Sequence, residues 1–327
     1  MRYSYKGISF NCKHSYDLSD EKFIELKNEF YKKPSKQEIE KELINISKGG
    51  LKFPKIKQYY FKEIMAKTTV GDCYFTVEDV FNNKELLGIF VSKIQNNPKV
   101  FDKKTEIGNI ENCFRLCGHP ISRLPSNFPI KTCYHILDKY NVNNNYFDFS
   151  CGWGVRLLAS LYKNVNYYGV DPNYLLTDKL IELDKDYRNT VGRDKITKIY
   201  TQGSETYIHE LENKIGLAFS SPPYFKLELY NIGKQSCTKE TLYEEWLENY
   251  IKPTMYNIKK YLIRGGYFLW NINNYKQYKL VEDTVKIIED NGFNYLGDET
   301  LKNTSLRLTI KGSYKDNSER IMVFKKD

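Results

Sequence analysis

Residues 146–154, YFDFSCGWG, decide the fold that this sequence predicts. A short apolar run ends at Asp148, the glycines Gly152 and Gly154 follow, and an apolar helix-forming stretch, VRLLASLYK, begins directly after them. Glycines let the backbone turn tightly and approach a ligand closely, and the N-terminus of a helix presents free N–H groups. The stretch therefore predicts a strand, a glycine turn and a helix that together bind a small ligand.

The residues around the glycines distinguish between two kinds of ligand. A dinucleotide-binding turn carries a third glycine where this chain has Leu157. Asp148 precedes the glycines, and its carboxylate would repel a pyrophosphate but can pair with the ammonium group of an amino acid. S-adenosylmethionine has such an ammonium group, so it fits this turn better than a dinucleotide does.

Strand-like and helical stretches alternate from Tyr146 towards the C-terminus. The strand-like runs are YFDFS, YYGVD, KITKIY, GLAFSS and GYFLWNI, and helical stretches separate most of them. Such alternation predicts βαβ units and a mostly parallel sheet. Two further strand-like runs, LRLTIKG and ERIMVFKK, are joined by SYKDNS and predict a terminal antiparallel hairpin.

The first part of the chain has a different pattern, which changes near residue 120. Residues 19–97 read as helices, one of which starts at Ser35 with Glu38 three residues later, as in a capping box. A second stretch, TVEDVFNNKELLGIFVSKI, spaces its apolar residues as a helix would. We therefore expect a mainly helical segment over residues 1–120 and an α/β domain over residues 121–327.

Two further strand ends carry candidate ligand contacts. Asp171 ends the run YYGVD, 23 residues after Asp148, where a fold of this type hydrogen-bonds the hydroxyls of a ribose. Ser204 and Glu205 follow the third strand-like run, at the place where an adenine ring would be flanked. An N-cap formed by Ser204 is an equally good interpretation of that last position.

The most specific motif is Ser221-Pro222-Pro223-Tyr224, directly after an apolar strand-like run. Two prolines make the strand end rigid, and because they lack N–H groups the nearby carbonyl oxygens stay available as acceptors. The Ser221 hydroxyl and the Pro222 carbonyl can accept hydrogen bonds from an exocyclic amine, and Tyr224 offers a ring for stacking. The motif therefore predicts a site for an amino group on a planar base.

With these motifs the chain resembles the class I S-adenosylmethionine-dependent methyltransferases, specifically the DNA methyltransferases that modify amino groups. Their catalytic motif reads [D/N/S]-P-P-[Y/F/W], and SPPY at residues 221–224 is the form typical of the cytosine-N4 members. Their glycine motif reads D-P-F-x-G-x-G, and here Phe149 and Ser150 replace its Pro-Phe. Upstream, RLPSNFP at residues 123–129 is similar to the family's additional cofactor motif, in which Phe128 lines the methionine end.

The resemblance covers residues 123–327 and implies a Rossmann-like fold with a mostly parallel seven-stranded sheet. It implies that S-adenosylmethionine is the cofactor and that its methyl group goes to the exocyclic amine of a DNA base, cytosine N4 above all. The implied cofactor contacts are Phe128, Pro129, Asp148, Ser150, Gly152, Gly154, Asp171, Ser204 and Glu205. The implied catalytic residues are Ser221, Pro222, Pro223 and Tyr224, and the loop after them offers substrate contacts at Lys226, Glu228 and Tyr230.

Other substrates stay open. Adenine N6 in DNA, an amino group of an RNA base and a glutamine side chain are alternatives, although the glutamine methyltransferases use Asn in place of Ser221. Methylation at carbon 5 of cytosine needs a Cys nucleophile beside the proline, and the neighbours here are Ser and Tyr. A catalytically inactive homologue that binds nucleic acid is a further alternative, against which the retained motifs argue.

The charge distribution favours nucleic acid as the partner. The formal net charge is +9, and residues 1–146 hold 24 basic and 17 acidic residues, so most of the excess lies there. Between residues 52 and 67, lysines alternate with aromatic residues, which suits phosphate neutralisation and base stacking, although a solvated basic face is the simpler interpretation. Only about 70 residues separate the glycine motif from SPPY. We therefore expect residues 1–120 to recognise the target, with DNA favoured over RNA.

Several other classes of protein do not fit the composition. The seven cysteines are irregularly spaced, which argues against a disulfide scaffold and for a reducing compartment. No run approaches the roughly 18 to 20 apolar residues that span a bilayer, so we expect a soluble, cytoplasmic protein without a membrane partner. Cys113, Cys117 and His119 cluster without an evident fourth ligand, so no metal is predicted. The oligomeric state is left open.

Overall fold

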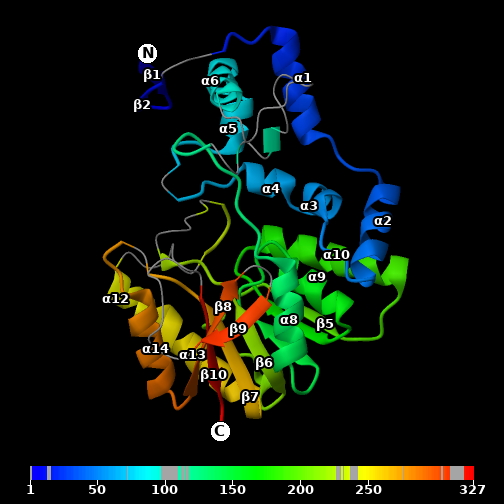
Figure 1. The fold of residues 1–327 in the computed structure, drawn as a ribbon, viewed down its shortest axis with the longest axis vertical. Coiled ribbons are helices and arrows are strands. Elements are labelled where there is room, and N and C mark those ends of the chain that lie inside the picture. Colours follow the sequence, from blue (N-terminus) through cyan, green and yellow to red (C-terminus); the bar gives the residue numbers. More distant parts are fainter. Residues whose placement is uncertain are drawn as a thin grey trace. The chain divides into compact units, whose positions relative to one another are not determined.

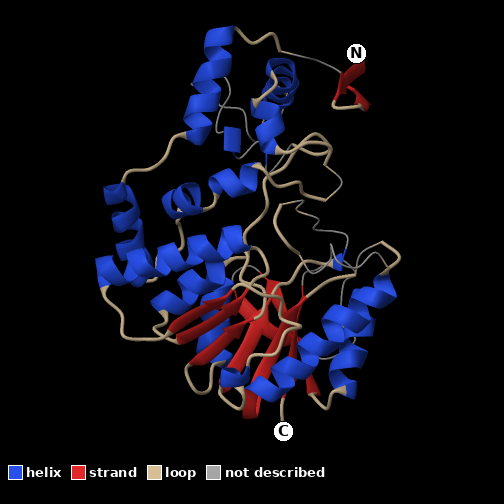
Figure 2. Ribbon diagram, turned by 180° about the vertical axis from the view of Figure 1, so that it is seen from behind, coloured by secondary structure: helices blue, strands red, loops and turns tan. Residues whose placement is uncertain are grey.

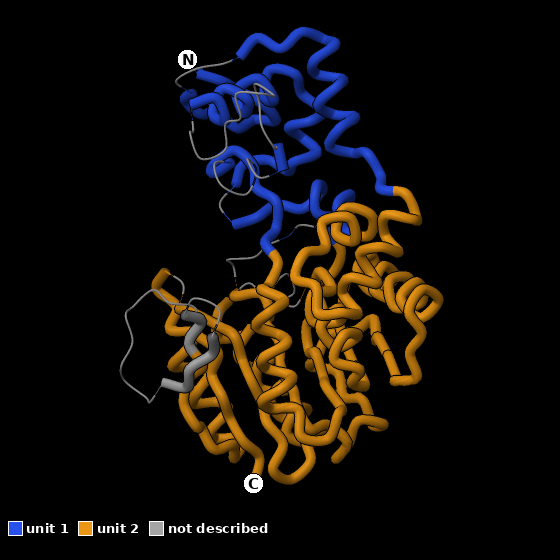
Figure 3. Tube along the Cα trace, turned by 45° about the vertical axis from the view of Figure 1, so that its right-hand side comes forward, with its two compact units in different colours: residues 1–34, 61–126, 227–232 blue, residues 35–60, 127–226, 233–327 orange. Residues whose placement is uncertain are grey.

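The computed structural model describes residues 2–12, 16–71, 73–96, 110–111, 114, 118–225, 230, 232–235, 242–274, 276–302, 305–309 and 320–327. The chain forms two compact units (Figure 3). The helical unit comprises Met1–Pro34, Phe61–Ser126 and Leu227–Ile232, and the sheet unit comprises Ser35–Tyr60, Asn127–Lys226 and Gly233–Asp327. The two units therefore interleave along the chain instead of following one another.

An eight-stranded sheet is the centre of the sheet unit, in the order β5-β4-β3-β6-β7-β10-β8-β9 (Figure 1). The strands from β3 to β7 are parallel to one another, whereas β10 runs antiparallel to both β7 and β8. The strands are β3 (Asn145–Asp148), β4 (Asn166–Val170), β5 (Thr197–Tyr200), β6 (Ile215–Ser220), β7 (Leu262–Asn271), β8 (Asn294–Lys302), β9 (Ser305–Thr309) and β10 (Arg320–Lys325).

The strand order identifies the fold. From β3 the chain builds outward through β4 to β5, then returns to the other side of β3 with β6 and β7. Ligands of open α/β sheets bind where the strand order reverses in this way, beyond the carboxyl ends of the strands. Together with the antiparallel strand β10, this order gives the Rossmann-like class I methyltransferase fold, so the predicted fold class is confirmed.

Helices stand on both faces of this sheet (Figure 2). In α8 and α14 an apolar stripe is buried and the opposite side is more polar, which explains why they lie against the sheet, whereas α9 is buried on all sides over residues 155–161. From residue 130 onward the helices are α8 (Ile130–Tyr140), α9 (Val155–Tyr162), α10 (Tyr174–Val191), η1 (His209–Leu211), α12 (Tyr243–Trp246), η3 (Leu247–Ile251), α13 (Lys252–Tyr261) and α14 (Leu280–Asp290) in the described part of the chain.

Two helices from the first part of the chain belong to the sheet unit, α2 (Lys36–Ser47) and α3 (Pro54–Tyr60). The predicted capping box at the start of α2 is present: Ser35 accepts a hydrogen bond from the backbone of Glu38, whose side chain accepts one from Ser35. Both helices pack near α10, where the Tyr60 hydroxyl donates to Asp186 at 2.5 Å. Long-range contacts of this kind place residues 35–60 with the sheet.

The helical unit has an aromatic core. The Phe90 and Phe114 rings are stacked with centroids 4.0 Å apart, and Phe30 stacks on Phe81 at 4.5 Å. Its elements are the hairpin of β1 (Arg2–Tyr5) and β2 (Ile8–Asn11), with α1 (Asp20–Tyr31), α4 (Lys62–Ala66), α5 (Val77–Phe81) and α6 (Lys84–Gln95). The apolar residues that the helical spacing predicted to be core are buried in α5 and α6.

The pairing of the last strands differs in detail from the expected hairpin. β9 and β10 are not neighbours, because β8 lies between them and pairs with both. The strand β8 was not predicted. β10 is apolar over Ile321–Phe324 and fully buried there, which suits a position inside the sheet between two strands. No helix in the described part of the chain is long and apolar enough to cross a membrane.

Candidate cofactor and amine-binding site

The carboxyl ends of four neighbouring strands carry polar residues at one edge of the sheet. Asp148 ends β3, Asp171 follows β4, Ser221 follows β6 and Asn271 ends β7. Because these strands are parallel, their carboxyl ends meet at the same edge, which is where this class of sheet binds ligands. Three of the four residues were predicted from the sequence.

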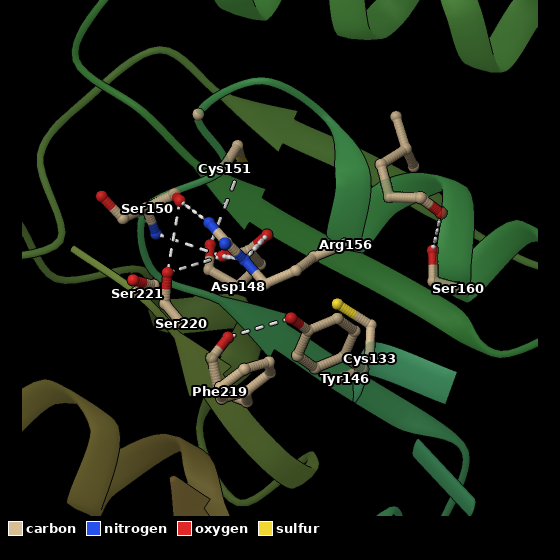
Figure 4. A network of polar contacts seen from close by, with 12 residues as sticks. Cys133, Tyr146, Asp148, Ser150, Cys151, Arg156, Ser160, Phe219, Ser220 and Ser221 are labelled. Atoms are coloured by element: carbon tan, nitrogen blue, oxygen red, sulfur yellow. Dashed lines mark hydrogen bonds and ion pairs between the residues drawn. The ribbon is translucent and has the colours of Figure 1, made fainter. Parts of the chain in front are cut away.

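A buried ion pair lies beneath the glycine turn (Figure 4). The Nε of Arg156 donates to both carboxylate oxygens of Asp148 at 3.0 Å, and the hydroxyls of Tyr167 and Ser220 donate to the same carboxylate at 2.8 and 2.9 Å. Asp148 has no exposed surface and Arg156 is buried. The carboxylate also accepts from the N–H of Ser150 at 3.4 Å, and the ammonium partner that the sequence suggested for it stays a prediction.

Arg156 also holds the backbone of the turn. From the first turn of α9 its guanidinium reaches past Asp148 and donates to the carbonyl oxygen of Ser150, as Figure 4 shows. The hydroxyl of Ser220 donates to the same oxygen at 3.2 Å. Arg156 was not predicted as a site residue, although a charged residue in the mostly apolar stretch VRLLASLY indicates a buried partner.

The two predicted glycines have the backbone conformation that the turn requires. Gly152 has a φ of +54° and Gly154 a φ of +75°, both in the left-handed region that favours glycine. A Cβ at Gly152 would meet only the Ser150 oxygen, at 3.8 Å, so the space beside this residue is open. An open cradle next to a helix start fits a ligand that approaches the backbone closely.

Asp171 is linked directly to this turn. One carboxylate oxygen accepts a hydrogen bond from the N–H of Gly152 at 2.9 Å, and the other accepts one from the N–H of Asn173 at 3.0 Å. Burial raises the pKa of Asp171 to about 6, and the charge of Asp148 adds to the rise while the two N–H donors oppose it. The carboxylate therefore changes its charge near neutral pH.

The residues predicted to flank an adenine lie in the loop after β5. Ser204 is buried, its hydroxyl pairs with that of Thr254 at 2.9 Å, and its carbonyl accepts from Asn257 at 2.9 Å. These contacts anchor the loop to α13. The carboxylate of Glu205 lies against Gly203, where an added Cβ would come within 2.0 Å of it. Contact of either side chain with an adenine stays a prediction.

Phe128 and Pro129 lie at the start of α8. The Phe128 ring meets Phe219 of β6 edge to face with centroids 5.5 Å apart, and Pro129 occupies the N-cap position of α8. The predicted upstream motif therefore contacts the strand that leads into Ser221. This contact links two sequence motifs that are about 90 residues apart in the chain.

The SPPY motif directly follows β6, and Asn271 of the adjacent strand β7 contacts it. The Nδ2 of Asn271 donates to the Ser221 hydroxyl oxygen at 2.9 Å and to the Tyr224 hydroxyl oxygen at 3.4 Å. Asn271 is buried. Asn271 was not predicted as a site residue, although it is a polar residue near the end of the apolar run GYFLWNI.

The residue after the motif fixes its far end. Phe225 is fully buried and has a φ of +29°, an unusual value for a residue with a side chain. Its ring packs against Tyr243, Trp246 and Tyr278 with centroid distances of 5.5, 5.6 and 5.1 Å. This aromatic cluster holds the backbone of the motif against α12.

Several predicted residues are not part of the site as the structure describes it. Lys226 and Glu228 fall outside the described residues, as do Cys113 and Cys117. Tyr230 belongs to the helical unit, where its carbonyl accepts from the N–H of Thr69 at 3.3 Å. Within the part of the chain that the structure describes, no three His, Cys, Asp or Glu side chains gather as metal ligands would.

The lysines between residues 52 and 67 are engaged to different degrees. Lys62 is buried, lies over the Phe30 ring at 4.2 Å and pairs with Glu111 at 3.3 Å. Lys55 pairs with Glu38 at 3.1 Å. A uniform row of lysines facing phosphates therefore does not describe these positions, and Lys62 has a packing role in the helical unit.

Comparisons with known proteins add similarities of backbone alone. No family model matches the chain, and no curated protein does. Solved structures that resemble it include a TehB-like SAM-dependent methyltransferase from Corynebacterium glutamicum, 14% identical over 61% of this chain and 87% of that chain, with a TM-score of 0.41. A magnesium protoporphyrin IX methyltransferase from Synechocystis with bound SAM is 13% identical over 61% and 78%, with a TM-score of 0.40. A SAM-dependent methyltransferase from Clostridium acetobutylicum is 17% identical over 61% and 93%, with a TM-score of 0.40. At this level of similarity the strand order, not these neighbours, carries the fold assignment.

Proposed function

We propose that the protein transfers a methyl group from S-adenosylmethionine to the exocyclic amine of a nucleobase in DNA, with cytosine N4 as the favoured target. One observation carries the proposal. Ser220, directly before the SPPY motif, hydrogen-bonds both Asp148 and the Ser150 carbonyl of the glycine turn. A cofactor cradle and a site for a planar amine are thus joined by a single residue.

The residues around the turn fit S-adenosylmethionine. The open space beside Gly152 accommodates a ligand against the backbone, and Asp171 offers carboxylate oxygens for ribose hydroxyls. Phe128 supplies an apolar wall next to β6. The cofactor supplies the electrophilic methyl group, and Arg156 neutralises the buried carboxylate of Asp148 beneath the turn.

The SPPY motif would hold the edge of the base that carries the amine. As the amine nitrogen forms its new bond to carbon, it becomes tetrahedral and positively charged, and it later releases a proton. The carbonyl oxygen of Pro222 can only accept a hydrogen bond, so it stabilises this charge selectively in the transition state. The Ser221 hydroxyl lies beside it, and the Tyr224 ring provides a stacking surface.

Duplex DNA would have to release the target base before the reaction. An enzyme that acts on a base flips it out of the helix at a cost of about a few kcal/mol, and stacking on an aromatic ring recovers part of that cost. Tyr224 is the candidate ring. We assign the rest of the nucleic-acid contact to residues 1–120, where most of the positive charge excess lies.

Adenine N6 in DNA and an amino group of an RNA base are the alternatives, because both present the same kind of amine to the motif. Transfer of a labelled methyl group from the cofactor to DNA, RNA or protein separates them. We expect label in DNA from the wild type and none from Ser221→Ala, with cofactor binding retained in both. Label in RNA or protein alone would move the proposal to that polymer, and binding of nucleic acid without any transfer would overturn it.

A further inference from the structure

The side-chain amide of Asn271 faces two hydroxyls of the SPPY motif. Its Nδ2 donates to Ser221 at 2.9 Å and to Tyr224 at 3.4 Å, so both of its hydrogens are used. Its Oδ1 is buried and has no hydrogen-bond partner among the described residues. Asn271 itself is 2% exposed. A buried, half-satisfied amide that contacts two residues of a motif calls for a physical explanation.

The orientation of this amide follows from which groups would be left unpaired. A reversed amide would accept from the two hydroxyls but would leave two buried N–H groups without acceptors. Buried orphan N–H groups are rarer than carbonyls with unused lone pairs. The observed orientation leaves one acceptor unsatisfied, so it is the better of the two.

This orientation determines what the Ser221 hydroxyl can do. A hydroxyl has one hydrogen to donate and two lone pairs to accept with. The Asn271 N–H occupies one lone pair, and within the described part of the chain no acceptor takes the Ser221 proton. That proton is therefore available to a ligand, and the carbonyl oxygen of the following residue, Pro222, can only accept. The two consecutive residues thus offer one donor and one acceptor.

We propose that Asn271 is a positioning residue that turns the Ser221 hydroxyl into a donor towards the unprotonated ring nitrogen next to the target amine. The inference rests on the proposed function and deepens it. Cytosine presents such an edge with N3 and N4, and adenine presents one with N1 and N6. The Ser221 hydroxyl donates to the ring nitrogen, and the amine itself is left to the carbonyl of Pro222. The motif then hydrogen-bonds two adjacent groups of the base, the ring nitrogen and the amine, instead of the amine alone.

The variant Asn271→Asp tests this assignment because it changes only one atom. Above the pKa of the introduced carboxyl group it can only accept, so it draws the Ser221 proton to itself. Below that pKa the neutral acid can donate as the amide does. Burial raises such a pKa, which brings the transition into an accessible range. We expect kcat/KM on DNA to fall about 10- to 100-fold at pH 8, and to recover as the pH is lowered.

Three comparisons make the result specific. Asn273→Asp adds the same charge two residues away, and a carboxylate there still accepts from the Asn274 N–H as Asn273 does, so its profile should follow the wild type. Cofactor affinity should stay within about twofold in all variants, because the hydrogen bonds of Asn271 go to the SPPY motif and the glycine turn follows another strand. Asn271→Asp combined with Ser221→Ala should show no recovery at low pH, because the double variant has no Ser221 hydroxyl to orient.

A target base whose ring nitrogen is replaced by C–H provides the last test. Wild-type protein should methylate DNA with 3-deazacytosine at the target position at least about tenfold more slowly than normal DNA, and Asn271→Asp at pH 8 should discriminate little between the two. Activity of Asn271→Asp that is unchanged at high pH and lost at low pH would mean that the amide accepts from Ser221, which overturns the inference. The inference would also be overturned if Asn271→Asp lost the same fraction of activity at every pH and still discriminated between normal DNA and DNA with 3-deazacytosine. Absence of any methyl transfer by the wild type would instead refute the proposed function.

Discussion

Replacing Arg156 with methionine tests whether its ion pair with Asp148 holds the glycine turn in place. Methionine keeps much of the length and apolar stem of the side chain but removes the charge and the donors. Asp148, with no exposed surface, would lose contacts at 3.0 Å from Nε to both of its oxygens, and the Ser150 carbonyl would lose its guanidinium donor. Removing one partner of a buried pair leaves an uncompensated charge and costs about 3 to 5 kcal/mol.

The fluorescence of tryptophan is a suitable assay for this change. All three tryptophans, Trp153, Trp246 and Trp270, belong to the sheet unit, so their signal follows the unfolding of that unit. At about 2 to 4 °C per kcal/mol for a unit of this size, Arg156→Met should lower the Tm by about 6 to 20 °C. It should also weaken cofactor binding, because the backbone at Ser150 is no longer held.

Two controls separate this effect from loss of charge in general. Lys179→Met breaks the exposed pair with Glu182 in α10 and should cost less than about 1 kcal/mol. Arg156→Met combined with Asp148→Asn removes both charges and should be less destabilising than Arg156→Met alone. A loss below about 1 kcal/mol in Arg156→Met, equal to that of the Lys179 control, would refute the structural role assigned to the ion pair.

Three further predictions concern the turn and the motif. Because burial raises the pKa of Asp171 to about 6, the contribution of its protonated form to stability is present below about pH 4 and is lost as the pH rises through about 6. Cofactor affinity gains from the ionised carboxylate, so calorimetric titrations should show it falling below about pH 6. In Asp171→Asn the affinity should not change with pH. Gly152→Ala should lower the free energy of unfolding in urea by about 1 kcal/mol, because Gly152 has a positive φ. It should reduce the free energy of cofactor binding by more than that, because the added methyl group enters the open cradle. Phe225→Ala should cost about 3 to 5 kcal/mol and abolish methyl transfer while cofactor binding persists; normal transfer would show that the aromatic cluster does not hold the motif.

Much of the fold was predictable because its signals are local. Residues 146–162 predict a strand, a glycine turn and α9, because an apolar run, two glycines and a helix-forming stretch follow one another there. The capping box of α2 was readable for the same reason. The pairing of β8, β9 and β10 was not, because a strand order depends on contacts between residues far apart in the chain.

The candidate site, like the fold, has residues that the sequence predicts and residues that it does not. Asp171, the two glycines and SPPY could be proposed from residue type and spacing, and they lie at the expected strand ends. Arg156 and Asn271 could not be given partners, because each contacts a residue that only the folded sheet brings near. The interleaving of the two units could not be predicted, because α2 and α3 have ordinary helical sequences. Their contacts with α10 in the folded protein assign them to the sheet unit.

The most direct test of the account is nucleoside analysis of DNA from cells that express the protein. Mass spectrometry of hydrolysed DNA should find N4-methylcytosine with the wild type and none with Ser221→Ala expressed at the same level. N6-methyladenine in place of N4-methylcytosine would change the target base and keep the mechanism. Unmodified DNA from cells that contain folded, cofactor-binding wild-type protein would contradict the central claim.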